Sequence, residues 1–184
     1  MLHIITNPHA YRALQAEIDS VPVAGSIISD EQAKNFPYLQ AVIKEGARVY
    51  PPGTGLMSKI VPPEGDTVNG VFIPGGTEIG ECFWGVQRNK EIYGEDAMLF
   101  RPERWLEAEG EKLEKMEKTI QLVWGHGKYQ CLGKNLAFME LNKTFFEVSH
   151  FCISSRHDPR WLPRSLRFLA TRTTPHTSQA LLIQ

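Results

Sequence analysis

The 184-residue sequence lacks the features that assign a chain to several special classes of protein. Its three cysteines, Cys82, Cys131 and Cys152, lie far apart and form no CxxC pair, so neither a disulfide framework nor a four-ligand zinc site is indicated. The formal net charge is only −1, which provides no general electrostatic field for nucleic acid or for an anionic membrane. Nucleic-acid binding is therefore not expected.

Long apolar segments are also missing. The first residues contain no signal-peptide core and no basic flank. No apolar run approaches the roughly 18 residues that a membrane-spanning helix requires. We therefore expect no membrane anchor in this chain and interpret it as soluble and intracellular. Its length allows one domain, or part of a larger one, with enough residues for a hydrophobic core.

Hydrophobic spacing predicts mainly α structure with a small β-sheet region, an α+β fold. Asn7 and Pro8 are typical of a helix start. A second helix is predicted from about Tyr38 to the residue before Pro51, because proline disfavours the α conformation in its predecessor. A third, long helix is predicted over about 134–151.

The segments 55–61 and 66–81 are predicted to form short strands, with Asn69-Gly70 as a hairpin turn, because both residues tolerate positive φ. The charge-rich segment 106–118 is interpreted as a solvated connection without a function of its own. This places the regular structure on either side of one polar stretch.

The last residues differ in composition from the rest of the chain. Five of the ten arginines follow residue 155, yet only one of the 21 acidic residues lies there. We therefore divide the chain into 1–153 and a divergent, arginine-rich tail, 154–184, that we expect to be poorly ordered.

Cys131 stands in an unusual local setting. Gly125, Gly127 and Gly133 surround it, and glycine permits positive φ and close approach of the backbone to a ligand. The predicted helix from Lys134 would direct free N–H groups and a positive dipole end toward the sulfur, which favours the thiolate. This pattern is typical of a metal ligand or of a nucleophile.

Other roles for Cys131 remain open at this point. Most free cysteines are buried structural residues. A hydrolase-like nucleophile would need a histidine base, and His126 is near in sequence, but no orienting acid is evident. A helical interaction domain with a structural cysteine is a further alternative.

Four motifs in order resemble the cytochrome P-450 family of heme-thiolate monooxygenases. Residues 124–133 read W-x-x-G-x-x-x-C-x-G, which resembles the family's heme-ligand loop. Glu45 and Arg48 match its E-x-x-R pair, while "GVFIPGGTEI" (70–79) and "FRPERWL" (100–106) resemble its small-sheet and P-E-R-W elements. The resemblance covers about four-fifths of the chain and implies the C-terminal, heme-ligating part of such a fold, with a fungal character and a place in fungal secondary metabolism.

The resemblance implies a role for each loop residue. Cys131 would be the axial ligand of the iron of heme b (iron protoporphyrin IX), since a thiolate donates electron density to iron. Trp124 would shield the sulfur, and Gly125, Gly127 and Gly133 would shape the loop. The thiolate ligand is therefore the central expectation for this chain.

The resemblance also implies a supporting network. Glu45 and Arg48 share one helix face and, together with Arg104, would brace the loop through charge-assisted hydrogen bonds. Without the other motifs, the ordinary interpretation of Glu45 and Arg48 would be a surface salt bridge.

The partners of the heme propionates differ from the family's usual pattern. The family commonly has arginine two residues before the cysteine, where this chain has Tyr129. Lys59 and Lys128 are therefore candidate propionate partners, and Tyr129 is a candidate hydrogen-bond donor.

One expected motif is missing. The family's acid–alcohol pair, which delivers protons to bound oxygen, does not occur in this sequence, so no catalytic residue is identified. The resemblance implies a small organic substrate, an NADPH-dependent reductase and an endoplasmic-reticulum membrane location for the full-length enzyme. The isolated chain is expected to be inactive as an oxygenase, and exposed apolar faces that include Phe145 and Phe146 are expected to make it prone to aggregation. The alternative is a non-catalytic heme-binding remnant or a truncated gene product.

Overall fold

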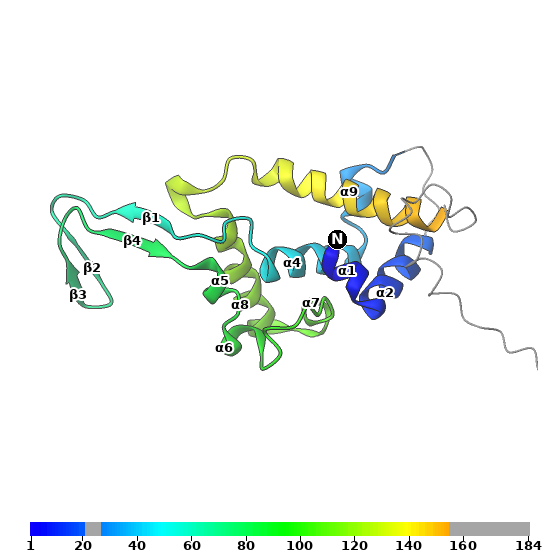
Figure 1. Ribbon diagram of the computed structural model, residues 1–184, viewed down its shortest axis with the longest axis horizontal. Coiled ribbons are helices and arrows are strands. Elements are labelled where there is room, and N and C mark those ends of the chain that lie inside the picture. Colours follow the sequence, from blue (N-terminus) through cyan, green and yellow to red (C-terminus); the bar gives the residue numbers. More distant parts are fainter. Residues whose placement is uncertain (21–26, 155–184) are drawn as a thin grey trace, which may run out of the picture.

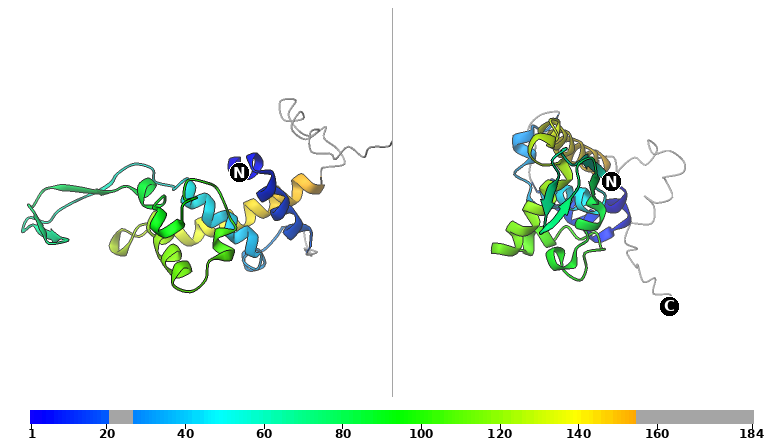
Figure 2. Two further views of the ribbon diagram at one scale, coloured as in Figure 1. Left: turned by 90° about the horizontal axis from the view of Figure 1, so that it is seen from below. Right: turned by 90° about the vertical axis from the view of Figure 1, so that its left-hand side faces the viewer.

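The structure is a computed structural model that describes residues 1–20 and 27–154 (Figure 1). It has a helical body from which a β arm, residues 57–81, projects (Figures 1 and 2). The predicted fold class, mainly α with a small β region, is confirmed. The helices are α1 (Leu2–Thr6), α2 (Pro8–Asp19), α3 (Asp30–Ala33), α4 (Pro37–Val49), α5 (Phe83–Val86), α6 (Lys90–Tyr93), α7 (Arg104–Glu107), α8 (Gly110–Gln121) and α9 (Lys134–Ser154), with 3₁₀ turns η1 (Leu122–Trp124) and η2 (Gly127–Tyr129).

Helix α2 begins as its sequence predicts. The Asn7 side-chain oxygen accepts hydrogen bonds from the amides of His9 and Ala10, each at 3.2 Å, and Pro8 occupies the first helical position. These bonds satisfy amides that have no partner inside the helix.

Helix α4 also agrees with its prediction, since it ends at Val49 before the two prolines. Its N-cap residue, Phe36, has no side-chain acceptor to offer. Instead, the Glu17 carboxylate on α2 accepts from the amides of Tyr38 and Leu39, at 2.7 and 2.8 Å. A carboxylate at this position also interacts favourably with the helix dipole.

The β arm contains two antiparallel pairs. β1 (Met57–Ile60) pairs with β4 (Glu78–Glu81), and β2 (Asp66–Val68) pairs with β3 (Val71–Ile73). The predicted turn is confirmed, with Asn69 at φ 50° and Gly70 at φ 80°.

Helix α4 lies between two clusters of buried residues. Leu39, Val42 and Ile43 of α4 belong to the first cluster, which also contains residues of α2, α3 and α9. Ala41, on another face of α4, belongs to the second cluster, which α6, α7, α8 and η1 complete. A helix that contributes to both clusters fixes the two halves of the body relative to each other.

The prediction of a solvated connection at 106–118 is wrong. Most of this segment belongs to α7 or α8, and Met116 and Ile120 are buried in the second cluster. Leu113, Met116 and Ile120 recur at helical spacing, so one apolar stripe faces the body while the many charged residues face solvent. The high charge obscured this narrow stripe.

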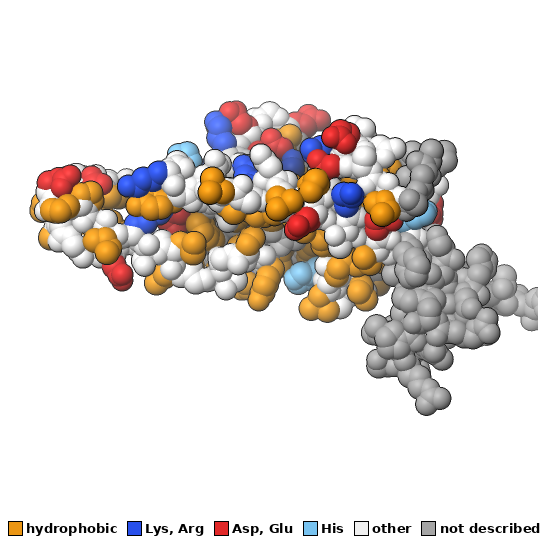
Figure 3. Space-filling model, turned by 90° about the horizontal axis from the view of Figure 1, so that it is seen from above, with side chains coloured by type: hydrophobic (Ala, Val, Ile, Leu, Met, Phe, Trp, Pro, Cys, Tyr) orange, Lys and Arg blue, Asp and Glu red, His pale blue; other side chains and the backbone are white. Residues whose placement is uncertain are grey.

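The expectation that Phe146 is exposed is also wrong. It is buried on α9 and packs against Phe36, with ring centroids 5.1 Å apart, while Phe145 is half-buried against the same cluster. Figure 3 looks down onto α9 and shows hydrophobic side chains interspersed with charged ones along this side of the molecule. The exposed apolar residues at the start of α9 are Leu132, Leu136 and Met139.

Two expectations concern other features of the chain. Apart from Ser154, the predicted arginine-rich tail, 154–184, lies outside the described residues. Across residues 1–20 and 27–154, none of the helices is both long and apolar enough to cross a membrane.

Substitution of Phe146 by alanine should lower the free energy of unfolding by about 3–5 kcal/mol, because a large buried ring is lost and a cavity remains. Phe145→Ala is the matched control and should cost clearly less, since Phe145 is only half-buried. Urea unfolding of both variants measures the difference. Equal losses would contradict the packing described for α9.

Candidate functional site

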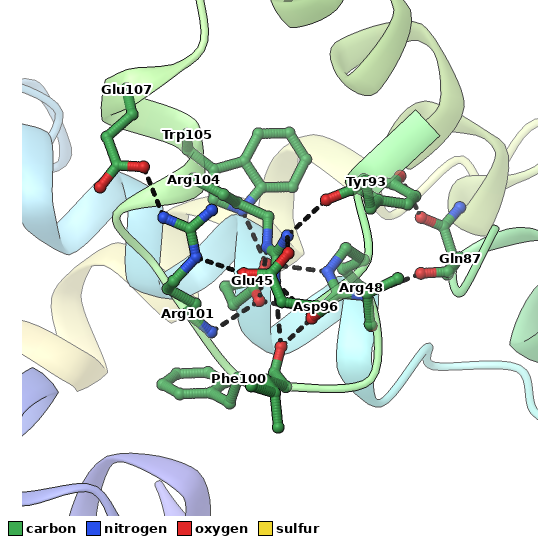
Figure 4. Close-up of polar contacts among 12 residues, drawn as sticks. Glu45, Arg48, Gln87, Tyr93, Asp96, Phe100, Arg101, Arg104, Trp105 and Glu107 are labelled. Atoms are coloured by element: carbon green, nitrogen blue, oxygen red, sulfur yellow. Dashed lines mark hydrogen bonds and ion pairs between the residues drawn. The ribbon is translucent and has the colours of Figure 1, made fainter. Parts of the chain in front are cut away.

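The Glu45 carboxylate is the centre of a buried polar network (Figure 4). Glu45 is fully buried, and its two oxygens accept five hydrogen bonds between them. The donors are Arg48 Nε and Nη2 (2.9 and 2.8 Å), Arg104 Nε (3.0 Å), the Arg101 amide (2.8 Å) and Trp105 Nε1 (2.9 Å). A buried carboxylate persists only when it is paired and hydrogen-bonded in this way.

Arg48 is also fully buried, and each of its five N–H groups has an acceptor. Two of them make the parallel pair of bonds to Glu45. The other three reach the carbonyl oxygens of Gln87 (2.8 Å), Ala97 (2.6 Å) and Leu99 (2.8 Å). Arg48 therefore connects α4 to the irregular chain between α5 and α7.

Arg104 is 2% exposed at its side chain and makes a similar set of bonds from α7. Its Nε donates to Glu45, and its other nitrogens reach the carbonyls of Tyr93 (2.7 Å), Asp96 (3.0 Å) and Leu99 (3.2 Å). The Asp96 carboxylate accepts a further bond from Nη1 at 2.9 Å. Arg101 pairs in turn with Asp96 and Glu107, so three arginines and three carboxylates balance their charges within the network.

The pKa of Asp96 reflects two opposing influences. Partial burial is the largest and raises the pKa, but hydrogen bonds from Arg104 and Arg101 outweigh it. The net pKa lies below the ordinary value of 3.8.

The structure brings Glu45, Arg48 and Arg104 together, and it adds partners that the sequence reasoning missed. Trp105 and Arg101 lie within the quoted motif "FRPERWL", so their proximity to Arg104 was a usable signal. Asp96 and Gln87 carried no such signal, because nothing in their spacing distinguishes them from surface residues.

Cys131 is exposed in the loop that follows α8 and η1. Its amide donates to the carbonyl of Trp124 at 2.7 Å, which closes the loop on itself. Trp124 is buried and packs against Phe138 of α9, with ring centroids 5.2 Å apart. The loop therefore has a buried aromatic base and presents its thiol at the surface.

The three loop glycines differ in backbone conformation and in the space available for a side chain. Gly125 has φ 75°, and a Cβ there would lie 2.4 Å from the carbonyl oxygen of Tyr129, so a side chain is excluded on both grounds. Gly127 has φ 57°. The expected positive φ at Gly133 is wrong: its conformation is ordinary, and a Cβ would meet Cys131 Sγ at 3.8 Å. A contact at this distance is ordinary packing, so nothing in the structure requires glycine at position 133.

Lys59, Lys128 and Tyr129 lie together where the β arm faces η2. The two ammonium groups lie 5.1 and 5.0 Å from the centroid of the Tyr129 ring. All three residues line a cavity of about 340 Å³, as does Glu81. Lys59 Nζ lies 3.9 Å from Glu81 Oε1. The cavity thus combines two cations and a phenol that can donate a hydrogen bond with two carboxylates, those of Asp66 and Glu81.

The arrangement fits a planar metal cofactor that already supplies most of the ligands to its metal. Cys131 offers one soft, accessible sulfur. Two cations nearby suit the carboxylates of such a cofactor. Within the described parts of the chain, no group of three or more His, Cys, Asp or Glu side chains is arranged to hold a bare metal ion.

Comparison with known proteins defines the class. The family described as Cytochrome P450 matches residues 1–163. The chain belongs to the cytochrome P-450 family, whose characteristic cofactor is heme.

Several curated fungal proteins are similar to the chain. Cytochrome P450 monooxygenase ABA1 of Pyricularia oryzae is 47% identical over 152 residues, which are 80% of this chain and 30% of the relative. The aba1 monooxygenase of Botryotinia fuckeliana is 44% identical over 151 residues, with coverage of 80% and 30%. Pisatin demethylase of Fusarium vanettenii is 37% identical over 163 residues, with coverage of 88% and 31%. The chain thus spans about 30% of the length of these relatives.

Removal of either partner of the Glu45–Arg48 pair should be strongly destabilising. Glu45→Ala and Arg48→Ala should each lower the free energy of unfolding by about 3–5 kcal/mol, because an uncompensated buried charge remains. The double variant should lose much less than the sum. Arg48→Lys should also be destabilising, since an ammonium cannot replace five fixed donors.

Denaturant unfolding measures this cycle, with Glu114→Ala as the control because Glu114 and Lys118 form an exposed pair. The control should show no measurable change. Additive losses in the double variant would show that Glu45 and Arg48 do not act as one unit.

Asp96 should make stability depend on acid pH. Its folded pKa lies below the unfolded value of 3.8, so it stabilises the fold above that pH, and this stability is lost as the pH falls through the folded pKa. Asp96→Asn should therefore be less stable than the parent chain at neutral pH, and the difference should shrink below pH 3.8. Unfolding across this range measures the effect, with exposed Glu95→Gln as the control. A pH-independent difference would contradict the ion pairing of Asp96.

Proposed function

We propose that this chain ligates heme b through Cys131 and forms the heme-ligating part of a heme-thiolate monooxygenase. The observation that carries the proposal is that Cys131 is accessible on a loop whose base, Trp124, is buried. The loop follows α8, which packs in the helical body. Membership of the cytochrome P-450 family supports it. When bound, such a heme supplies the activation of dioxygen for insertion of one oxygen atom into an organic molecule.

The chain's own residues have separate tasks in this proposal. Cys131 donates its thiolate to the iron, and Trp124 excludes water from the protein side of the loop. Lys59 and Lys128 are the proposed cationic partners of the heme propionates and Tyr129 a proposed hydrogen-bond donor to them, since all three line one cavity. Glu45, Arg48 and Arg104 keep the loop in place without contacting the heme.

The partners and location follow from the family. We propose a small organic substrate, as the name of the relative pisatin demethylase indicates for that protein. Electrons would come from NADPH through a reductase, and the enzyme would associate with the endoplasmic-reticulum membrane inside the cell. We also propose a role in fungal secondary metabolism; the similar proteins named above are from fungi.

A second candidate is a heme-binding protein without monooxygenase activity. It requires only the candidate ligand Cys131 and the loop that presents it, both of which the structure describes. Reductase-dependent turnover of an added substrate distinguishes this candidate from an enzyme.

Cys131→Ser should abolish the strongly red-shifted ferrous–CO Soret band that reports thiolate ligation, while heme can still be added to the protein. Cys82→Ser is the matched control, because Cys82 is also exposed and free but lies between β4 and α5, outside the Cys131 loop. The control should keep the band. A red-shifted band in Cys131→Ser would show that another residue is the ligand, and the proposal would be wrong.

A further inference from the structure

Gln87 is fully buried and directly follows α5. It lies outside the sequence motifs that resemble the family. Its backbone carbonyl accepts from Arg48 Nη1 at 2.8 Å, so it belongs to the Glu45 network. Its side-chain amide points the other way and donates to the carbonyl of Thr119 on α8 at 2.8 Å. Figure 4 shows Gln87 at the edge of the network, with its side-chain oxygen against Tyr93.

The side-chain oxygen of Gln87 is fixed as well. It accepts from the Tyr93 hydroxyl at 2.6 Å, and burial raises the pKa of Tyr93, so the phenol keeps its proton as a donor. Tyr93 is in turn held by Arg104, which donates to its carbonyl at 2.7 Å, and its ring lies against Arg48, 5.0 Å from the guanidinium carbon. The amide of Gln87 therefore has one orientation, with its N–H directed at α8.

The place where Gln87 meets α8 is significant. Thr119 lies in the last turn of the helix, and its carbonyl oxygen accepts from the amide of the C-cap residue Leu122 as well as from Gln87. Two residues after Thr119 the helix ends and continues directly into η1, which finishes at Trp124. The carbonyl oxygen of Trp124 then accepts a hydrogen bond from the Cys131 amide at 2.7 Å. A single side chain thus joins the Glu45 network to the helix end from which the loop starts.

We propose that Gln87 is a positioning residue for Cys131: by holding the C-terminal turn of α8 against Arg48, it fixes the loop at Trp124 to Cys131. Its relevance to heme rests on the proposed function, but its effect on the loop does not. Gln87 contacts neither Cys131 nor any cofactor, so it acts only through α8.

Gln87→Met tests this because methionine has a similar length but no amide. Hydrogen exchange should show the Gly125 and Cys131 amides opening roughly fivefold faster, the factor that corresponds to about 1 kcal/mol for one neutral hydrogen bond. Gln15→Met is the matched control, since Gln15 is also a buried glutamine but lies on α2. It should change exchange in the first cluster and leave the two loop amides unaffected.

A second readout uses the heme-loaded protein. Gln87→Met should bind heme but convert from the red-shifted thiolate-type ferrous–CO band to an unshifted one faster than Gln15→Met does. Unchanged exchange at Gly125 and Cys131 in Gln87→Met would overturn the inference. If those amides open faster but Cys131→Ser keeps its red-shifted band, the proposed function fails while the positioning role of Gln87 stands.

Discussion

The structure depends on one buried carboxylate. Glu45 accepts five hydrogen bonds from groups that lie 3 to 60 residues away in the sequence. A buried charge with this many donors is stable only while all of them stay in place, because a lost donor leaves a desolvated group without compensation. The irregular chain between α5 and α7, which has little regular structure to stabilise it, is ordered by these bonds to Glu45 and Arg48.

The position of the Cys131 loop follows from that constraint. Arg48 and Gln87 connect the network to α8, and α8 runs into the turn that contains Trp124. Glycine at position 125 then lets the chain reverse where a Cβ would lie only 2.4 Å from the carbonyl oxygen of Tyr129. The result is an exposed sulfur on a loop whose base is buried, which suits a ligand that approaches from outside the described body.

Much of this arrangement is predictable from local sequence, and part of it is not. Asn7, the Asn69-Gly70 turn and the prolines after α4 determine local conformation, so the structure confirms what they predict. The burial of α8 was missed because its apolar stripe is narrow and its charge is high. The partners Asp96 and Gln87 were missed for another reason: a hydrogen bond between residues 39 positions apart depends on the tertiary path of the chain, as with Arg48 and Gln87.

The central claim is that Glu45 places the Cys131 sulfur at the iron without touching it. Iron-edge X-ray absorption of the heme-loaded protein, compared with heme-loaded Glu45→Gln at equal heme content, tests this most directly. Glutamine keeps the size of the side chain but removes the charge that pairs with both arginines. The account predicts a sulfur scatterer bound to iron in the parent protein and its loss from a large fraction of the variant. A sulfur ligand at full occupancy in both would contradict the claim, as would its absence from the parent protein.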